Sequence, residues 1–441
     1  MFGWFAPKCP VDTHTKTWVE RRMVWLADRF GVDRLRNATI ILPTDEFFPD
    51  TYSSDEDGCR ACLHRMCRYM GVDPRSIELR IVDDELMPDA AGTYHMREQS
   101  VICVAVTQLD DPMRLMATVA HELLLKGGHL TGNEHDHEQV TDLLPVFLGT
   151  GIFAANATVQ TKSWSEGQWS HSTYSRQGYL SSIELGYALA VFANFRGEDR
   201  PNWSKHLRTD AAVTLRDSLR YLRKSGDTLF HPEGYVSERA RSTTSNQDLK
   251  LADPSPTVRL NALLDLSEQS ETPPASLLPA TLELLADSDP HVQRMAVRVL
   301  GKFGPAAADR VPDLIELSRH GRTEEIRVEA TVALGGNGAN PDQVIPILIA
   351  NLGVTETKVV CAAADALGRF GPLAEPAQPK LIEVLEAAAS LSDRDRVTHV
   401  VIALRTIHPE GAARVRTYFA SADPEVRRTV IEELIRQEGD Q

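Results

Sequence analysis

The sequence predicts an α+β domain over residues 1–235, followed by an all-α solenoid over residues 251–441. Three observations support this fold class. The second region repeats with a period near 34 residues, the length of a stacked pair of helices. The first region has no repeat and mixes helical patterns with short apolar runs bounded by turn residues. Residues 236–250 are rich in Ser, Thr and Arg and poor in apolar residues, so we expect them to form a linker.

In the first domain, apolar residues recur at helical spacing in six segments. These are residues 18–31, 56–71, 111–128, 136–157, 183–197 and 209–226. Short apolar runs with the composition of strands occupy residues 39–43, 77–82 and 100–106. The Trp-rich stretch SWSEGQWSHSTYSRQGYLS has neither pattern, and we expect it to form a loop.

Each repeat of the second region has a turn signal, then a branched residue, a small residue and a Leu near the end of the same helix. The branched residues align in steps of 34, 34, 33, 38 and 29: Val258, Val292, Ile326, Val359, Val397 and Val426. Asp-Pro or Asp-x-Asp begins the helix by capping it. Small residues such as Ala296 and Ala330 let neighbouring helices approach closely, and we expect Gly301, Gly335 and Gly368 to end their helices. Each unit therefore buries its apolar face only against the next unit.

These units resemble HEAT-like repeats, and the resemblance covers residues 251–441. It implies an α-solenoid whose concave face binds another macromolecule, and we expect that partner to be a protein. The alternative is an array that only braces the domain before it.

Acidic side chains outnumber basic ones by 62 to 47, which gives a formal charge of −15. The positive footprint of a phosphate-backbone binder is therefore missing, and nucleic acid is not the expected partner. No apolar run approaches the roughly 18 to 20 residues that cross a bilayer, and the N-terminal residues lack a signal-peptide pattern. Six cysteines are too few for a disulfide scaffold. We expect a cytoplasmic protein that does not contact a membrane.

His121 and Glu122 stand side by side in ATVAHELLLKGG, and Glu138 follows in DHEQVTD, with Asp142 four residues later. In zinc peptidases, HExxH places two His on one helical face, and the Glu between them is the general base. With these motifs, residues 17 to 232 resemble a zincin-type metallopeptidase domain of the HExxH plus ExxxD kind. They also resemble uncharacterised bacterial proteins in which such a domain precedes other modules. Further segments that carry the resemblance are ILPTDEFFPD, CRYMGVDP, the Trp-rich stretch and GDTLFHP.

The resemblance implies a role for each matching residue. His121 and Glu138 would be ligands of Zn²⁺, Glu122 the general base, and Asp142 the group that orients the His121 imidazole. A tetrahedral oxyanion would need a hydrogen-bond donor, and the Trp-rich stretch offers three candidates: His171, Tyr174 and Tyr179. The alternative for the aromatic residues of this stretch is packing in the core.

The sequence departs from the metallopeptidase pattern at the second histidine, because Leu125 stands in its place. The run AHELLLKGGHLTG has the form of AHELxHxLLLKGGH after the loss of four residues, which nearly preserves helical phase. One imidazole and one carboxylate bind zinc weakly, whereas catalytic sites use three protein ligands. A replacement ligand would come from the following loop: His129, His135 or His137. The alternative is that NEHDHEQ is a solvated loop and helix start, capped by Asn133 or Asp136.

Cys59, Cys62 and Cys67, together with His64, have the form CxxCxHxxC. A zinc site is one interpretation, but no second CxxC occurs elsewhere. The other is that the cysteines are buried, small apolar residues of a helix.

Two functions follow from these patterns. The first is a HEAT-repeat, protein-binding scaffold whose metallopeptidase-like domain has weak or lost hydrolase activity. The alternative is an active, cytoplasmic zinc-dependent peptidase that uses a loop histidine as replacement ligand and recruits its substrate through the repeats.

Overall fold

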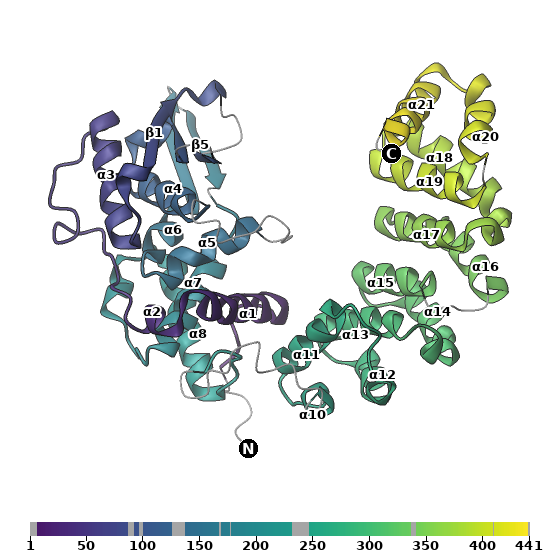
Figure 1. Cartoon of the computed structure of the whole chain (residues 1–441), viewed down its shortest axis with the longest axis horizontal. Helices are drawn as coiled ribbons and strands as arrows, with labels where there is room; N and C mark the ends of the chain where they lie inside the picture. The colour runs from purple at the N-terminus through teal and green to yellow at the C-terminus, as the bar shows by residue number, and fades with distance from the viewer. Residues whose placement is uncertain are drawn as a thin grey trace. The chain divides into compact units, whose positions relative to one another are not determined.

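The chain forms two compact units, Met1–Thr243 and Thr244–Gln441. The computed structural model describes residues 7–86, 92–96, 100–125, 137–166, 169–176, 178–231, 247–336, 341–408 and 410–439 (Figure 1). Of the stretch expected to be a linker, residues 236–246 lie outside these ranges and residues 247–250 are helical.

The first unit is built mainly from helices, and all six predicted helical segments contain helix. The helices are α1 (Thr13–Phe30), α2 (Val32–Arg36), α3 (Glu56–Met70), α4 (Pro112–Leu125), α5 (His137–Phe147), α6 (Gly151–Ala157), α7 (Ser182–Phe195) and α8 (Thr209–Ser225). Side chains cap the starts of three of these helices, α1, α3 and α7. Asp12 accepts from the backbone N–H of Thr15, Asp55 accepts from that of Gly58, and Ser181 forms a capping box with Glu184.

Two predicted boundaries differ from the structure for backbone reasons. The segment 136–157 is two helices, because Gly149 has φ +88° and turns the chain between α5 and α6. The run 39–43 is not a strand. Its Ile41 N–H instead donates to the Gly149 carbonyl at 2.9 Å, so this run packs against the turn rather than joining a sheet.

A three-stranded sheet has the order β1-β3-β2, from β1 (Ile77–Val82), β2 (Gly92–Met96) and β3 (Ser100–Ala105). β1 and β3 are parallel, with Ile77 opposite Ser100, and β2 is antiparallel to β3. Two of the predicted strands are thus confirmed, while β2 was not predicted. The parallel β1–β3 pair is joined by a connection that includes β2 itself.

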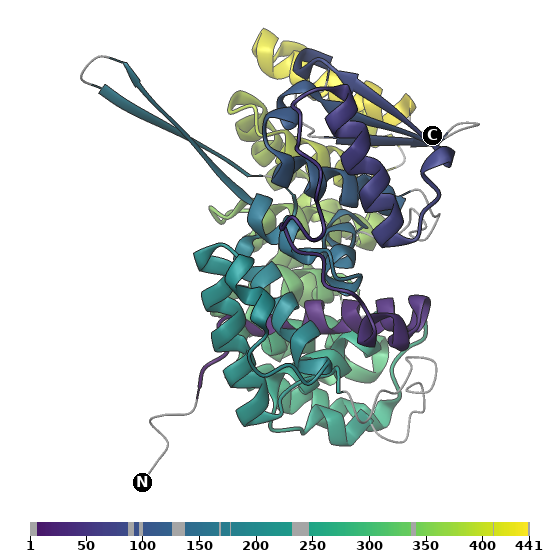
Figure 2. The ribbon, with the colours of Figure 1, turned by 90° about the vertical axis from the view of Figure 1, so that its left-hand side faces the viewer.

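The Trp-rich stretch forms a β-hairpin, so the prediction of a loop was wrong. β4 (Val159–Glu166) and β5 (Trp169–Arg176) are antiparallel and pair only with each other among the described residues. Figure 2 shows the two strands extending away from the helices of this unit. Ser and Thr alternate with larger residues here, so the strands carry little of the apolar alternation on which strand prediction depends.

A buried cluster of charged and phenolic groups ties α1 to the segment after α8. Glu20 is fully buried and accepts from the Tyr187 hydroxyl at 2.6 Å and the Leu229 N–H at 2.6 Å. Lys16, 2% exposed, lies 3.1 Å from Glu20 and 3.5 Å from Asp227. Burial, and then the charge of Glu20, hold the pKa of Tyr187 well above its usual value, so its hydroxyl stays a donor. One carboxylate therefore accepts hydrogen bonds from two later parts of the chain and forms an ion pair with Lys16.

The second unit is a stack of helices from α10 to α21. They are α10 (Gln247–Leu251), α11 (Pro256–Glu268), α12 (Leu278–Glu283), α13 (Pro290–Lys302), α14 (Val311–His320), α15 (Glu324–Leu334), α16 (Pro341–Asn351), α17 (Thr357–Phe370), α18 (Gln378–Ser390), α19 (Arg394–Ile407), α20 (Gly411–Tyr418) and α21 (Pro424–Gly439). Figure 1 shows α11, α13, α15, α17 and α19 packed in succession, and we call these helices the inner row. The outer helices α12, α14 and α16 pack against one side of this row.

Five of the six aligned branched residues of the repeats are buried in the core, while Val258 at the first repeat is only partly buried. These five are at most 7% exposed: Val292, Ile326, Val359, Val397 and Val426. Arginines tie one repeat to the start of the next. Arg259 donates to both carboxylate oxygens of Asp287 at 2.8 and 3.0 Å, and Arg327 donates to Glu356 at 2.9 Å. These pairs span 28 and 29 residues, close to the repeat period, so they recur as part of the stack.

The glycines of the repeats serve close packing. Gly335 ends α15, as predicted, but the same prediction was wrong for Gly301 and Gly368. Gly301 lies inside α13 and Gly368 inside α17, and neither has a positive φ. A Cβ added at Gly301 would lie 3.0 Å from the Ala333 side chain, and one at Gly335 would lie 2.7 Å from that of Ala366. The helices of the inner row therefore approach each other at positions where only hydrogen fits.

Removing the buried carboxylate should destabilise the first unit. We expect Glu20→Ala to lower its free energy of unfolding by about 3–5 kcal/mol, because Lys16 loses its closest buried partner. Trp fluorescence during urea unfolding of the full chain measures this unit alone, since all six Trp precede residue 244. Asp33→Ala is the control, because its pair with Arg36 is exposed. If Glu20→Ala and Asp33→Ala unfold at the same urea concentration, the stabilising role of the Glu20 carboxylate is contradicted.

Adding one methyl group between repeats should destabilise the second unit. We expect Gly335→Ala to cost about 1–3 kcal/mol, because its Cβ would overlap Ala366. The neighbouring change Gly336→Ala is the matched control, since its Cβ would meet nothing closer than 3.8 Å. Thermal unfolding followed by far-UV circular dichroism should show the loss, while the Trp fluorescence transition of the first unit stays in place. An unchanged transition for Gly335→Ala would refute the close-packing role.

Candidate functional site

Helices α4 and α5 bring His121 and Asp142 into contact. The His121 Nδ1 lies 2.9 Å from the Asp142 Oδ1, and the two side chains are 17% and 10% exposed. Both residues sit on helical faces that pack against each other, and neighbours of Asp142 such as Leu143 are fully buried. The pair is therefore held by the core and still reaches the surface through the imidazole.

The loop between β5 and α7 holds the other oxygen of the Asp142 carboxylate. Oδ2 accepts from the backbone N–H groups of Tyr179, at 2.5 Å, and Leu180, at 2.9 Å. Gly178, just before them, has φ +82°, and a Cβ there would lie 2.9 Å from Oδ2. Only glycine gives the loop both this backbone conformation and this close approach.

These contacts indicate which nitrogen of His121 carries the proton. An ionised carboxylate only accepts hydrogen bonds, so Nδ1 carries its proton toward Asp142. Nε2 then holds the lone pair, which is the form of imidazole that binds a metal ion or accepts a proton. The resemblance to a metallopeptidase implied this orienting role for Asp142, and the structure shows the contact itself.

Tyr179 extends the site toward solvent. Its ring lies nearly parallel to the His121 ring, at 19° and 6.3 Å between centroids, and the residue is 53% exposed. Core packing, the alternative account of this aromatic residue, is thus excluded for Tyr179. The side chains of the other two donor candidates, His171 and Tyr174, lie outside the described part of the structure.

Glu122, the predicted general base, is 5% exposed in α4. Adjacent residues of a helix are about 100° apart around its axis, so Glu122 and His121 leave α4 in different directions. Glu122 therefore faces more deeply into the unit than His121 does.

The remaining predicted ligands are not tested by the structure. His129 and His135 lie in residues 126–136, outside the described residues, and the side chains of His137 and Glu138, in the first turn of α5, lie outside them too. Among the residues that are described, no group of three or more His, Cys, Asp or Glu side chains could hold a metal ion. The Zn²⁺ prediction thus remains a prediction.

The cysteines of α3 are packing residues. Cys59 and Cys67 are fully buried, whereas His64 is exposed, so these groups do not share a face of the helix. Burial raises the pKa of Cys59 to about 12 and that of Cys62 to about 11, although metal binding needs the thiolate. The apolar interpretation of the CxxCxHxxC pattern is the one that fits.

Comparison with known proteins bears on the second unit. A family model described as HEAT repeats matches residues 249–335, which confirms the repeats there. No curated protein matches the sequence. An engineered protein of known structure is 20% identical over 43% of this chain and 96% of its own, with a TM-score of 0.29. Kap121p is 15% identical over 74% of this chain and 36% of its own, with a TM-score of 0.33. The fold assignment depends on the repeat match and the stacked helices.

In the described part of the chain, none of the helices is both long and apolar enough to cross a bilayer. The buried faces of the helices are matched by polar exposed faces, as the charged residues of α21 illustrate: Glu425, Arg427, Arg428 and Glu432.

Proposed function

We propose that the protein is a binding scaffold, in which the inner row of the second unit holds a segment of a protein partner. The observation that supports this proposal most directly is the HEAT-repeat match together with a stack that leaves one strip of each inner-row helix uncovered. The middle helices of the row, α13, α15 and α17, each pack against two neighbours in the row and against one outer helix. The strip that remains exposed is the surface that a partner would contact.

The inner strip carries charges of both signs. Arg298 on α13 is 55% exposed and lies 3.7 Å from Glu329 on α15. Further along, His399 on α19 lies 2.8 Å from Asp365 on α17, with both side chains more than a third exposed. Exposed pairs of this kind contribute about 0–1 kcal/mol each, so a partner can replace them at little cost. A mixed-charge strip favours a polar protein segment over a nucleic acid backbone.

The first unit would contribute a metallopeptidase-like fold with weak or lost hydrolase activity. The loss of the second histidine at Leu125 supports this part of the proposal. A cytoplasmic location is part of the same proposal.

A photo-crosslinker tests the scaffold proposal. We expect benzoyl-phenylalanine at Arg298 or Lys358, on the inner strip, to give a discrete crosslinked protein when the full chain is expressed in cells and irradiated. The control is the same group at Asp313, which is half exposed on α14 behind the row. Mass spectrometry identifies the product. Equal products from all three positions, or none from the inner strip, would leave the repeats with only a bracing role.

A second candidate function is an active zinc-dependent peptidase, which the His121–Asp142 contact favours. In this hypothesis His121, Glu138 and a third histidine, either His129 or His137 at the start of α5, would hold the ion. Bound zinc would act as a Lewis acid and lower the pKa of water. Glu122 would take the proton of the attacking water and pass it to the leaving amine. Asp142 would keep the proton of His121 on Nδ1, so that Nε2 stays available.

Zinc content distinguishes the two functions. If the site is complete, the full chain dialysed against equimolar zinc should retain about one ion, and His121→Ala should retain none. Asp142→Asn should bind zinc about 10 to 100 times more weakly, because the imidazole loses its orienting carboxylate. His64→Ala is the control, since this exposed histidine lies on α3. A parent protein without zinc would rule out the peptidase.

A further inference from the structure

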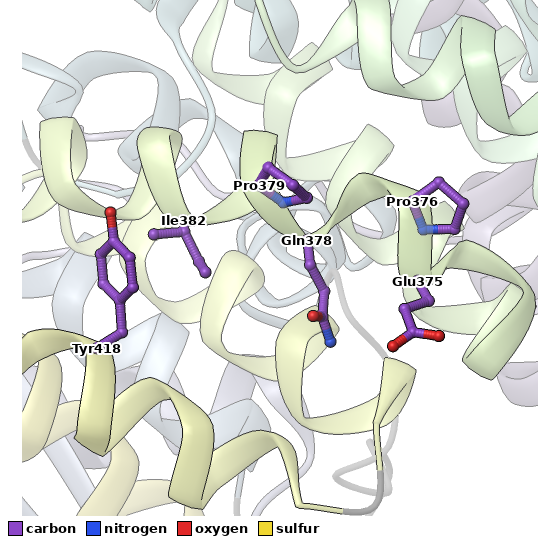
Figure 3. Close-up of a pocket in the computed structure, with 6 residues that line it drawn as sticks. All are labelled: Glu375, Pro376, Gln378, Pro379, Ile382 and Tyr418. Carbon is purple, nitrogen blue, oxygen red and sulfur yellow. The ribbon is translucent and has the colours of Figure 1, made fainter.

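A groove on the second unit lies apart from the inner row. It is formed where the 3-10 segment Gly371–Ala377 and the first turns of α18 face the end of α20, and its volume is about 620 Å³. Figure 3 shows the side chains that line it: Glu375, Pro376, Gln378, Pro379, Ile382 and Tyr418. A cavity of this volume suits a small ligand or a few extended residues.

The walls of the groove are apolar and fixed in place. Pro376 and Pro379 are exposed, and the Tyr418 ring is 52% exposed beside Ile382. Ala374 and Ala377 are fully buried, which anchors the segment that carries Pro376 to the core. Proline has a fixed φ and loses little conformational entropy on binding, so this surface is preorganised.

One end of the groove is polar. The Glu375 carboxylate and the Gln378 amide extend to the same side in Figure 3. Glu375 is 61% exposed, and its contact with Arg414 is long, at 3.7 Å, with Arg414 itself half exposed. Such a pair contributes about 0–1 kcal/mol, so the carboxylate can accept a second cation. The chain's charge of −15 also attracts basic segments.

We propose that this groove binds an extended, proline-containing segment of a partner protein, with a basic residue of that segment at Glu375. An extended polyproline segment has no internal hydrogen bonds and packs its rings on aromatic surfaces, which Tyr418 supplies. The Gln378 amide would bind a carbonyl of the segment. The inference rests on the scaffold function proposed above, and it adds a second contact of stated chemistry.

Fluorescence polarisation with the full chain and a labelled peptide, Arg-Pro-Leu-Pro-Pro-Leu-Pro, tests the proposal. We expect saturable binding that Tyr418→Ala weakens about tenfold or more, because aromatic anchors dominate such contacts. Tyr418→Phe should bind like the parent, since the ring is retained. Glu375→Gln should weaken binding severalfold, and only for the peptide that carries Arg. Leu249→Ala, a 71% exposed apolar residue on α10, is the matched control and should change nothing.

Several results would overturn the groove proposal: no binding at millimolar peptide, equal binding by Tyr418→Ala, or equal binding of a peptide with Ala in place of every Pro. The crosslinking experiment separates this failure from failure of the scaffold function. Inner-strip crosslinks without peptide binding would leave the scaffold function standing and remove the groove proposal. Peptide binding without inner-strip crosslinks would support the groove and contradict the role of the inner row.

Discussion

Close contact between successive inner-row helices is the constraint on which the second unit depends. Gly301 faces Ala333, and Gly335 faces Ala366, at distances that leave no space for another carbon. Because each repeat contacts only its neighbours, every one of these joints must hold for the stack to persist. The bidentate Arg259–Asp287 pair joins the helix ends at one of these steps. The same packing covers α13, α15 and α17 on three sides and leaves one strip of each exposed.

In the first unit, a single carboxylate has a comparable organising role. Asp142 connects α5 to His121 on α4 and to the backbone of Tyr179 and Leu180 in the loop before α7. The Asp142 carboxylate therefore orients the His121 imidazole and also holds the backbone of the loop before α7. The loop in turn follows directly from the β4–β5 hairpin.

Periodicity predicted the helices well, because a helical apolar face is a local property that a window of residues shows. Periodicity failed for segments whose structure depends on polar residues or on contacts with residues far away in the sequence. The hairpin of residues 159–176 was missed because its Ser and Thr residues mask the alternation of strands. Lys16 and Glu20 look like solvated residues of an amphipathic helix, and yet both are buried because Asp227 and Tyr187 meet them from later in the chain.

The sequence alone predicted the repeat period and five of the six branched residues that face the core, and a resemblance to a metallopeptidase motif predicted the pairing of His121 with Asp142. These features follow local rules of spacing or a linear motif. Only the tertiary structure decided that Gly301 and Gly368 serve helix contact, and that the loop at Gly178 holds the Asp142 carboxylate. The physical reason is that close approach and hydrogen bonding between segments depend on positions in space, and residues 37 or 38 apart share no local pattern.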